Sequence, residues 1–460
     1  MALPTPPDNA IAPETPVLDD PASNPNDLQS YWLPFTPNRA FKARPRLLVR
    51  GEGMHYWDKS GRKILDGISG LWCVNAGHAQ KSIVSAIQAQ AAELDYAPSF
   101  HFAHPKVITL AARLAALAPP GLENVFFCNS GSEAADTAMK IARGYFAAKG
   151  KPERFRFVSR VRSYHGVNFG GLSLGGLPNN AKGFGPLLPG TEHRLPLPYD
   201  FTRDRYTNGE LDGGTDYADA LEKICAEVGG DTIAAVIVEP MTGSGGVFMS
   251  PKGYLRRLRE ICDRHGILLI FDEVITGFGR LGYAFAAERY GVTPDMITFA
   301  KGVTNGAVPM GGVLVKKEIY EAFTPDADYA IDIFHGYTYT GHPLAAAAGI
   351  ATLDFYRDEG LFERGLKLEP KFRDAVFTLK GAPHVVDIRS VGLAAAIEME
   401  PIEGAIGKRG YQALETAFFD ENLVVRISGD TIVLIPALIA SEGDIGRIVE
   451  GVRAVLNRLD

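Results

Sequence analysis

The stretch ILLIFDEVITGFGRLGYAFAAERYGVTPDMITFAKG, residues 267–302, decides the fold expected for this chain. It contains two apolar runs, residues 267–271 and 296–300, each with the length and the β-branched or aromatic character of a fully buried strand. The first run stops at Asp272 and the second at Lys301. We therefore expect two ionisable groups at the carboxyl ends of neighbouring core strands, the edge where open α/β sheets bind ligands.

The residue types at these strand ends suggest a cofactor. A buried carboxylate or amine is costly without a partner. A desolvated lysine such as Lys301 has a lowered pKa and can form a Schiff base. Asp272 would then keep a pyridine nitrogen protonated, and these are the groups with which a protein tunes pyridoxal 5'-phosphate (PLP). Taken alone, the two residues are more simply explained as a structural ion pair, or Lys301 as the start of a loop.

Composition narrows the class of protein. The 460 residues suggest one large or two medium domains, and a net charge of −7 without a basic stripe argues against nucleic-acid binding. No apolar run is long enough to span a bilayer. The four cysteines are widely separated and lack metal-binding spacing, which predicts reduced thiols in the cytoplasm, with neither a disulfide frame nor a metal site.

The first thirty residues differ from the rest of the chain. They are rich in Pro and Asp and contain no Lys or Arg. A typical signal or transit peptide needs basic residues, so we do not expect the segment to be one of these. We expect residues 1–30 to form a flexible arm, ordered at most against a partner subunit.

Most of the remaining sequence alternates strand and helix patterns. Runs punctuated by turn signals predict an antiparallel meander over residues 46–66. Further strands are expected at residues 124–128, 156–159 and 232–239, and helices at residues 81–94, 253–265, 408–421 and close to the C-terminus. This β-α-β alternation predicts a mostly parallel sheet. The Gly-rich run at 170–176 fits no nucleotide motif, and we expect a flexible connection there.

The sequence NSGSEAADTAMKIA, residues 129–142, predicts an opening turn followed by a helix, with Asn129 or Ser130 as N-cap. A helix N-terminus is a ready anion site, so we assign Ser130, Gly131 and Ser132 to the cofactor phosphate. By itself the motif fits an ordinary capped helix equally well. Beside Asp272 and Lys301 it supplies the phosphate site that PLP needs.

The runs FDEVITGFGRLG, residues 271–282, and PDMITFAKGVTNG, residues 294–306, resemble the signature of the fold-type I, class III (ω-amino acid) aminotransferases, with Lys301 at the Schiff-base position. The similarity to the ω-amino acid:pyruvate (β-alanine:pyruvate) subgroup extends from about Tyr31 to the C-terminus. It implies an α/β fold with a mostly parallel central sheet in a large PLP-binding domain, expected over residues 76–345. A small α+β domain would combine residues 31–75 with residues 346–460.

The same resemblance implies roles for individual residues. Lys301 would hold PLP as an internal aldimine and carry protons, and Asp272 would face the pyridine nitrogen. Tyr164 and Val274 would lie on opposite faces of the ring, and Trp72 would line the substrate pocket together with Tyr164. The other residues expected near the cofactor are His165, Glu239 and, from the neighbouring subunit of a homodimer or dimer of dimers, Thr338.

Arg426 lies in an apolar strand, where a guanidinium needs a carboxylate from the protein or from a ligand. Asp430 is one candidate from the residues alone. The resemblance instead places Arg426 against the substrate carboxylate, for which a planar bidentate donor is suited. Where β-alanine-using members have Gln, this chain has Val433. The change favours longer or arylalkyl amines over β-alanine.

The resemblance therefore implies a ping-pong ω-transaminase that passes an amino group from an ω-amino acid or primary amine to pyruvate, with S-selective chemistry. The same residues also serve class III decarboxylating transaminases and aminomutases. A nicotinamide-dependent dehydrogenase should show GxGxxG after its first strand, and the sequence has none. A catalytically silent binding protein on this fold has no need for both Lys301 and Asp272.

Overall fold

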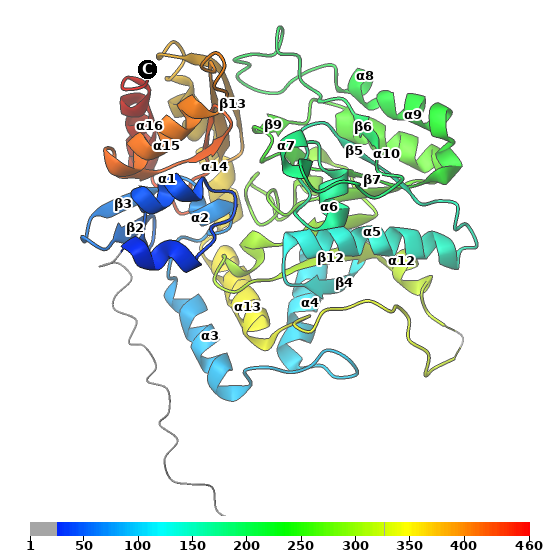
Figure 1. Cartoon of the computed structure of the whole chain (residues 1–460). Coiled ribbons are helices and arrows are strands. Elements are labelled where there is room, and N and C mark those ends of the chain that lie inside the picture. Colours follow the sequence, from blue (N-terminus) through cyan, green and yellow to red (C-terminus); the bar gives the residue numbers. More distant parts are fainter. Residues whose placement is uncertain (1–24, 326) are drawn as a thin grey trace, which may run out of the picture.

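The computed structural model describes residues 25–325 and 327–460, and its centre is a seven-stranded sheet in the order β4-β12-β11-β10-β7-β5-β6 (Figure 1). The strands are β4 (Leu122–Cys128), β5 (Arg156–Arg160), β6 (His193–Leu195), β7 (Ile233–Val238), β10 (Leu268–Asp272), β11 (Met296–Phe299) and β12 (Gly311–Lys316). Neighbours from β6 to β11 run parallel, whereas β12 runs antiparallel to both β11 and β4. The predicted mostly parallel sheet is confirmed.

Strand register gathers the polar strand ends at one edge of the sheet. Phe271 of β10 lies beside Val238, the residue before Glu239. Asp272 lies beside Thr298, three residues before Lys301. Because these strands are parallel, the groups that follow them emerge together at the carboxyl edge.

Helices cover both faces of this sheet. Ile270 packs in the same apolar cluster as the buried side of α5, and Phe271 faces the cluster that includes α10, as alternation along a strand requires. Figure 1 shows α5 lying across one face. The helices of this part are α3 (Lys81–Glu93), α4 (Pro105–Leu117), α5 (Gly131–Ala148), α6 (Phe169–Leu174), α7 (Pro178–Ala181), α8 (Gly214–Ala218), α9 (Ala220–Val228), α10 (Tyr254–His265), α11 (Ala286–Tyr290), α12 (Lys317–Glu321), α13 (Pro343–Asp358) and the 3-10 helices η2 (Gly230–Thr232) and η3 (Lys301–Thr304).

A second part combines both ends of the chain, as predicted. The antiparallel meander β1 (Leu48–Glu52), β2 (His55–Asp58) and β3 (Lys63–Asp66) gains a parallel fourth strand, β15 (Leu423–Val424). A separate antiparallel sheet has the order β13-β14-β17-β16. Its strands are β13 (Val385–Val391), β14 (Ala394–Met399), β16 (Arg426–Ser428) and β17 (Thr431–Leu434). The helices of this part are η1 (Pro25–Ser30), α1 (Asn38–Ala43), α2 (Ser69–Trp72), α14 (Leu361–Phe377), α15 (Lys408–Phe419) and α16 (Glu442–Leu456). A small hairpin, β8 (Met241–Thr242) and β9 (Phe248–Met249), lies between β7 and α10 in the chain.

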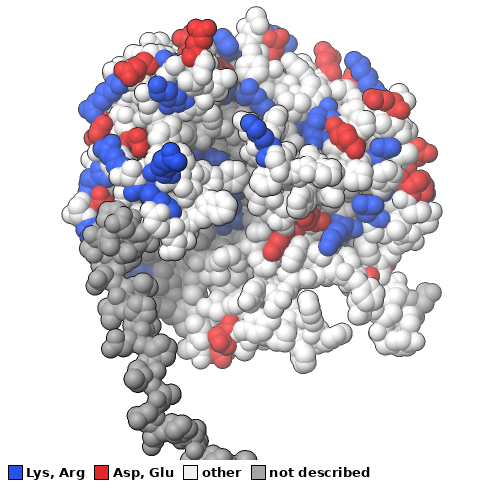
Figure 2. All heavy atoms as spheres, in the orientation of Figure 1, with Lys and Arg blue, Asp and Glu red and all other residues white. Residues whose placement is uncertain are grey.

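The expected limits of the domains, near residues 75 and 345, stay a prediction. Of the expected N-terminal arm, residues 1–24 lie outside the described residues, and Pro25–Ser30 forms η1. Figure 2 shows acidic and basic side chains intermixed over the face in view, and a hollow between the C-terminal elements and those of the central sheet. Within residues 25–325 and 327–460 no helix is long and apolar enough to cross a membrane.

The Gly-rich run at 170–176 is not a flexible connection, and that prediction was wrong. Residues 170–174 are buried, and α6 occupies most of the run. A Cβ on Gly170 would come within 2.4 Å of the Asp136 Oδ1 atom, and one on Gly171 within 2.2 Å of the His165 carbonyl oxygen. These glycines therefore allow close packing of α6 against α5 and the segment after β5.

Candidate active site

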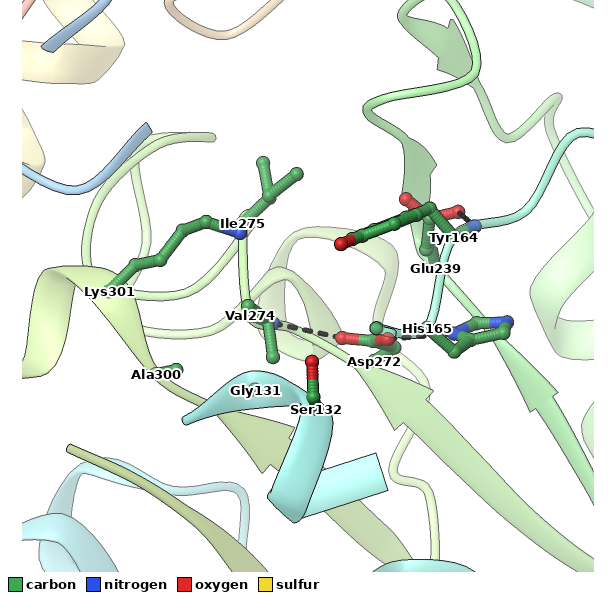
Figure 3. A pocket seen from close by; sticks show the side chains of 11 residues that line it. Gly131, Ser132, Tyr164, His165, Glu239, Asp272, Val274, Ile275, Ala300 and Lys301 are labelled. Carbon is green, nitrogen blue, oxygen red and sulfur yellow. Dashed lines mark hydrogen bonds and ion pairs between the residues drawn. The ribbon is translucent and has the colours of Figure 1, made fainter. Parts of the chain in front are cut away.

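A cavity of about 120 Å³ opens at the carboxyl edge of the central sheet (Figure 3). It is lined by residues from the N-terminus of α5 and from the segments that follow β5, β7, β10 and β11. The predicted residues that line it are Gly131, Ser132, Tyr164, His165, Glu239, Asp272, Val274 and Lys301. One hollow therefore brings together most of the residues expected to bind the cofactor.

Lys301 presents an amine without a partner to this cavity. Among the described residues its amine takes part in no hydrogen bond or ion pair. Burial lowers the pKa of Lys301, and the nearby Asp272 carboxylate only partly opposes this effect. The backbone at Lys301 has a φ of 51°, in the left-handed region that costs energy for a non-glycine residue. A strained, partly desolvated amine facing a cavity is suited to nucleophilic chemistry.

Asp272 is held by His165 and not by Lys301. The His165 Nδ1 atom lies 2.7 Å from Asp272 Oδ2, and the Val274 backbone N–H donates to Oδ1 at 3.2 Å (Figure 3). The side chain of Asp272 is 6% exposed. The alternative of a structural ion pair between Asp272 and Lys301 is wrong for this structure, and the carboxylate is fixed at the wall of the cavity.

The N-terminus of α5 forms another wall. Of the two predicted N-cap candidates, Asn129 and Ser130, the structure selects Ser130, whose side chain accepts a hydrogen bond from the Glu133 N–H at 3.2 Å. Gly131 and Ser132 line the cavity, whereas Ser130 does not. A Cβ on Gly131 would come within 2.9 Å of Val274, so only glycine permits this approach. The first N–H groups of the helix have no intrahelical acceptor and lie at the positive end of its dipole, which favours an anion.

Glu239 fixes the backbone at Tyr164. Its Oε1 atom accepts from the Tyr164 N–H at 3.1 Å, and its Oε2 atom accepts from the Gly243 N–H at 2.9 Å. Burial raises the pKa of Glu239 and that of Tyr164. Figure 3 shows the Tyr164 ring and Val274 on separate walls of the same space.

Arg426 is the first residue of β16, where it lies opposite Val433 of β17. It forms no ion pair among the described residues, and its Nε atom is buried without a hydrogen-bond partner. Burial lowers the pKa of Arg426. Asp430 instead accepts hydrogen bonds from the N–H groups of Gly407 and Gly410. The suggested pairing of Arg426 with Asp430 is therefore wrong, and the guanidinium is left for another anion.

Trp72 and Thr338 lie outside the residues that line the cavity. Trp72 is 2% exposed and packs in an apolar cluster with Ile275, which does line the cavity, and with Val433. Thr338 is exposed, and its carbonyl oxygen accepts a hydrogen bond from the Tyr96 hydroxyl at 3.0 Å.

The sequence analysis missed Gly166, Ile275 and Ala300, which also line the cavity. Each is the sequence neighbour of a predicted residue, namely His165, Val274 or Lys301, and this adjacency is the feature of the sequence that could have indicated them. The backbone at Gly166 has a φ of 104°, and a Cβ there would come within 2.6 Å of Ser132.

Comparison with known proteins identifies the family. Residues 38–456 match the family model described as aminotransferase class-III. The chain belongs to the class III aminotransferases. This aminotransferase is 53% identical over 435 residues to the ω-aminotransferase of Caulobacter vibrioides, a match that covers 95% of this chain and 99% of that protein. It is 45% identical to the β-alanine–pyruvate aminotransferase of Pseudomonas aeruginosa, over 95% and 97% of the two chains.

Solved structures agree with this assignment. The thermostable (S)-enantioselective ω-transaminase of Thermomicrobium roseum superposes with a TM-score of 0.87 at 38% identity, over 94% of this chain and 97% of the other. An amine transaminase from an uncultivated Pseudomonas species, solved in its PLP-bound form, gives 0.85 at 36% identity, over 94% and 99%. The aminotransferase is a fold-type I enzyme, and its cofactor is PLP.

The cavity of this aminotransferase fits PLP. The α5 N-terminus suits a phosphate, and the oriented Asp272 carboxylate suits a protonated ring nitrogen. The unpaired Lys301 amine suits the aldehyde carbon. The donors present thus match the three polar parts of the cofactor.

Proposed function

We propose that this aminotransferase is an ω-transaminase that moves an amino group from an ω-amino acid or other primary amine to pyruvate, giving alanine and an aldehyde or ketone in a ping-pong cycle. The observation that carries the proposal is that one cavity is lined both by the Lys301 amine, which has no bonding partner among the described residues, and by the Asp272 carboxylate, which His165 holds in place. The names of the most similar relatives, which include ω-aminotransferase and ω-amino acid–pyruvate aminotransferase, support it.

The cofactor would be held by residues on all sides of the cavity. Gly131 and Ser132 bind its phosphate, with Ser130 capping the helix behind them. Asp272 faces the ring nitrogen and is oriented by His165, while Tyr164 and Val274 enclose the ring and Glu239 supports Tyr164. When bound, PLP supplies a carbon that joins to amines and a protonated ring that withdraws electrons from the substrate.

Lys301 performs the proton transfers. Burial lowers the pKa of its amine, so that a neutral amine is available as a base closer to neutral pH. It removes a proton from the substrate carbon that carries the amino group and later returns a proton for the reverse transfer. The Asp272 carboxylate faces the ring nitrogen and holds a proton on it.

Arg426 binds the carboxylate of pyruvate. Its guanidinium is partly buried and lacks an ion-pair partner among the described residues, so an entering carboxylate would satisfy it. An amine donor without a carboxylate does not use this interaction. Ile275 lines the cavity, and Val433 and Trp72 pack behind it in the same apolar cluster, so that together they would form the apolar wall that meets the amine. We therefore expect arylalkyl amines of S configuration to react better than β-alanine.

The active enzyme is proposed to be a homodimer or a dimer of dimers in the cytoplasm. Thr338 lies on an exposed segment outside its own chain's cavity and would reach the cofactor phosphate of the neighbouring subunit. Phe334 and Tyr329 on the same segment are 89% and 93% exposed, which suits burial against a second copy. The four cysteines are free, in keeping with a reducing compartment.

The test is alanine formation from pyruvate with (S)-1-phenylethylamine and, separately, with β-alanine. We expect alanine from the aromatic amine and less from β-alanine. Release of CO₂ from an amino acid substrate would indicate a decarboxylating transaminase, and turnover without any keto acid an aminomutase. No alanine with any amine after loading with PLP would overturn the proposal.

A further inference from the structure

Arg280 is a buried cation that the mechanism above does not use. Its side chain is fully buried, and no salt bridge joins it to an acid within residues 25–325 and 327–460. Burial lowers the pKa of Arg280 to about 10. Placing a guanidinium in the core without a carboxylate is costly. We therefore ask which segments of the chain its hydrogen bonds fix in position.

Those hydrogen bonds join segments that are far apart in the sequence. Nη1 donates to the Pro436 carbonyl at 2.6 Å and to the Leu393 carbonyl at 3.1 Å. Nη2 donates to Asn75 Oδ1 at 2.6 Å and to Ser69 Oγ at 3.3 Å. One side chain from the segment after β10 thus connects the N-terminal segment 69–75 with the start of β14 and the end of β17.

The segment 69–75 is conformationally strained. Ser69 and Trp72 have φ values of 48° and 64°, in the left-handed region, and neither is glycine. Such a backbone persists only when its surroundings over-determine it. Ser69 Oγ also donates to the Ile435 carbonyl at 2.6 Å, so the serine bridges Arg280 to the strand-end that follows Val433.

The same contacts reach the turn that carries Lys301. Asn75, held by Arg280, donates to the Phe278 carbonyl at 2.9 Å. A Cβ on Gly302 would come within 2.8 Å of Asn75 Nδ2, so this amide packs directly behind the residue that follows Lys301. Arg280 therefore touches the supports of both Trp72 and the Lys301 turn without lining the cavity.

We propose that Arg280 is a specificity-determining positioning residue, whose buried guanidinium fixes the Ser69–Trp72 segment against the end of β17 and thereby sets the apolar wall of the amine pocket. The inference rests on the proposed function, because that assigns Trp72 and Val433 to the amine. Arg426, which receives the carboxylate, forms no bond with this network. Loss of Arg280 should therefore disturb amine recognition more than pyruvate recognition.

The test compares Arg280→Lys with Arg154→Lys in the PLP-loaded enzyme. Arg154 is a matched control, since it is buried and donates only to carbonyl oxygens, at the opposite end of the sheet. Arg280→Lys should raise KM for (S)-1-phenylethylamine about tenfold and change KM for pyruvate less than about twofold. Arg154→Lys should leave both constants unchanged.

A second readout does not depend on activity. Replacing Trp32 and Trp57 by Phe leaves Trp72 as the only tryptophan of the chain. In that background Arg280→Lys should increase acrylamide quenching of the Trp72 fluorescence about twofold or more, because a freed segment exposes the indole to solvent. Arg154→Lys should not change it.

Ser69→Ala keeps the buried charge and removes one hydroxyl, which accepts from Arg280 and donates to the Ile435 carbonyl, so this variant serves as the test if Arg280→Lys fails to fold. It should shift amine KM and quenching in the same direction by a smaller factor. Equal changes in both KM values, or quenching as low as in the parent, would overturn the role of Arg280. A parent enzyme that makes no alanine would overturn the proposed function instead, and the quenching experiment would still decide the role of Arg280.

Discussion

Buried charged groups have several bonding partners at the amino end of strands β10 and β11 and few at the carboxyl end. At the amino end, the Asp295 carboxylate accepts from Arg259 Nη1, Lys316 Nζ and the Leu269 N–H, each at 2.7 Å. At the carboxyl end, the Lys301 amine has no ion-pair partner among the described residues, and Asp272 is held by the His165 ring and the Val274 N–H, without a lysine or arginine bonded to it. Satisfied charges tie the fold together, whereas unsatisfied ones keep their capacity for a ligand.

The largest expected contrast is between the two lysines. Lys301→Ala should lower transamination by about 10³-fold or more, because both the nucleophile and the proton carrier are lost. Its melting temperature should stay the same or rise, since a desolvated, unpaired amine is removed. Lys316→Ala should keep kcat and lower the melting temperature, because Asp295 loses a partner. Steady-state kinetics and thermal melts on both variants check this, and a fully active Lys301→Ala would break the comparison.

Substitution of Asp272 should affect catalysis and substitution of Asp295 should affect stability, with a smaller loss of activity than for Lys301→Ala. Asp272→Asn keeps the shape of the side chain but removes its charge beside the ring nitrogen, so kcat should fall about 10²-fold to 10³-fold. Asp295→Asn should leave kcat within about twofold and lower the melting temperature, since it weakens bonds to two cations. A loss of kcat in Asp295→Asn equal to that in Asp272→Asn would show that the amino end also serves catalysis.

Arg426 tests whether an unpaired cation is reserved for substrate. Arg426→Leu should raise KM for pyruvate about 10²-fold, the value of a buried charge-assisted contact, without lowering thermal stability. Pre-steady-state conversion of the enzyme by (S)-1-phenylethylamine, which has no carboxylate, should change little. Equal losses with the amine and with pyruvate would contradict the assigned role.

The smallest expected effect is a change with pH in the stability that Glu273, the buried residue after Asp272, contributes. Burial raises the pKa of Glu273 from 4.5 to about 7, although the Ala287 N–H and the Thr276 hydroxyl, among others, donate to it. The folded state thus binds a proton that the unfolded state has released, so this group's contribution to stability falls as pH rises from about 4.5 to about 7. The melting temperature of wild type minus that of Glu273→Gln should be higher at pH 5 than at pH 8. A difference independent of pH would contradict the raised pKa.

Sequence alone predicted the elements whose own residues report their burial or their local hydrogen bonds. The apolar runs that became β10 and β11 are buried on both faces, so their composition reports their position directly. The N-cap was predicted to within one residue, Asn129 or Ser130, because capping uses nearby backbone only. The resemblance then supplied roles that no local pattern contains, such as those of Tyr164 and Glu239.

What sequence reasoning missed depends on contacts between distant segments. From their local sequence, the glycines of α6 suggest flexibility. In the structure they are needed because Asp136 and His165, from other segments, lie too close to leave room for a Cβ. Nothing in the run near Arg280 shows that its acceptors come from the N-terminal segment and from β17. The antiparallel direction of β12 likewise follows from tertiary pairing and not from its composition.

The most direct test of the central claim is to find which lysine binds the cofactor. The PLP-loaded enzyme is reduced with sodium borohydride, digested and examined by mass spectrometry, which locates the pyridoxyl group on a peptide. If unpartnered charge at the carboxyl end marks function, the group will be on Lys301. Its attachment to another lysine, such as the ion-paired Lys316, or to none, would contradict the account.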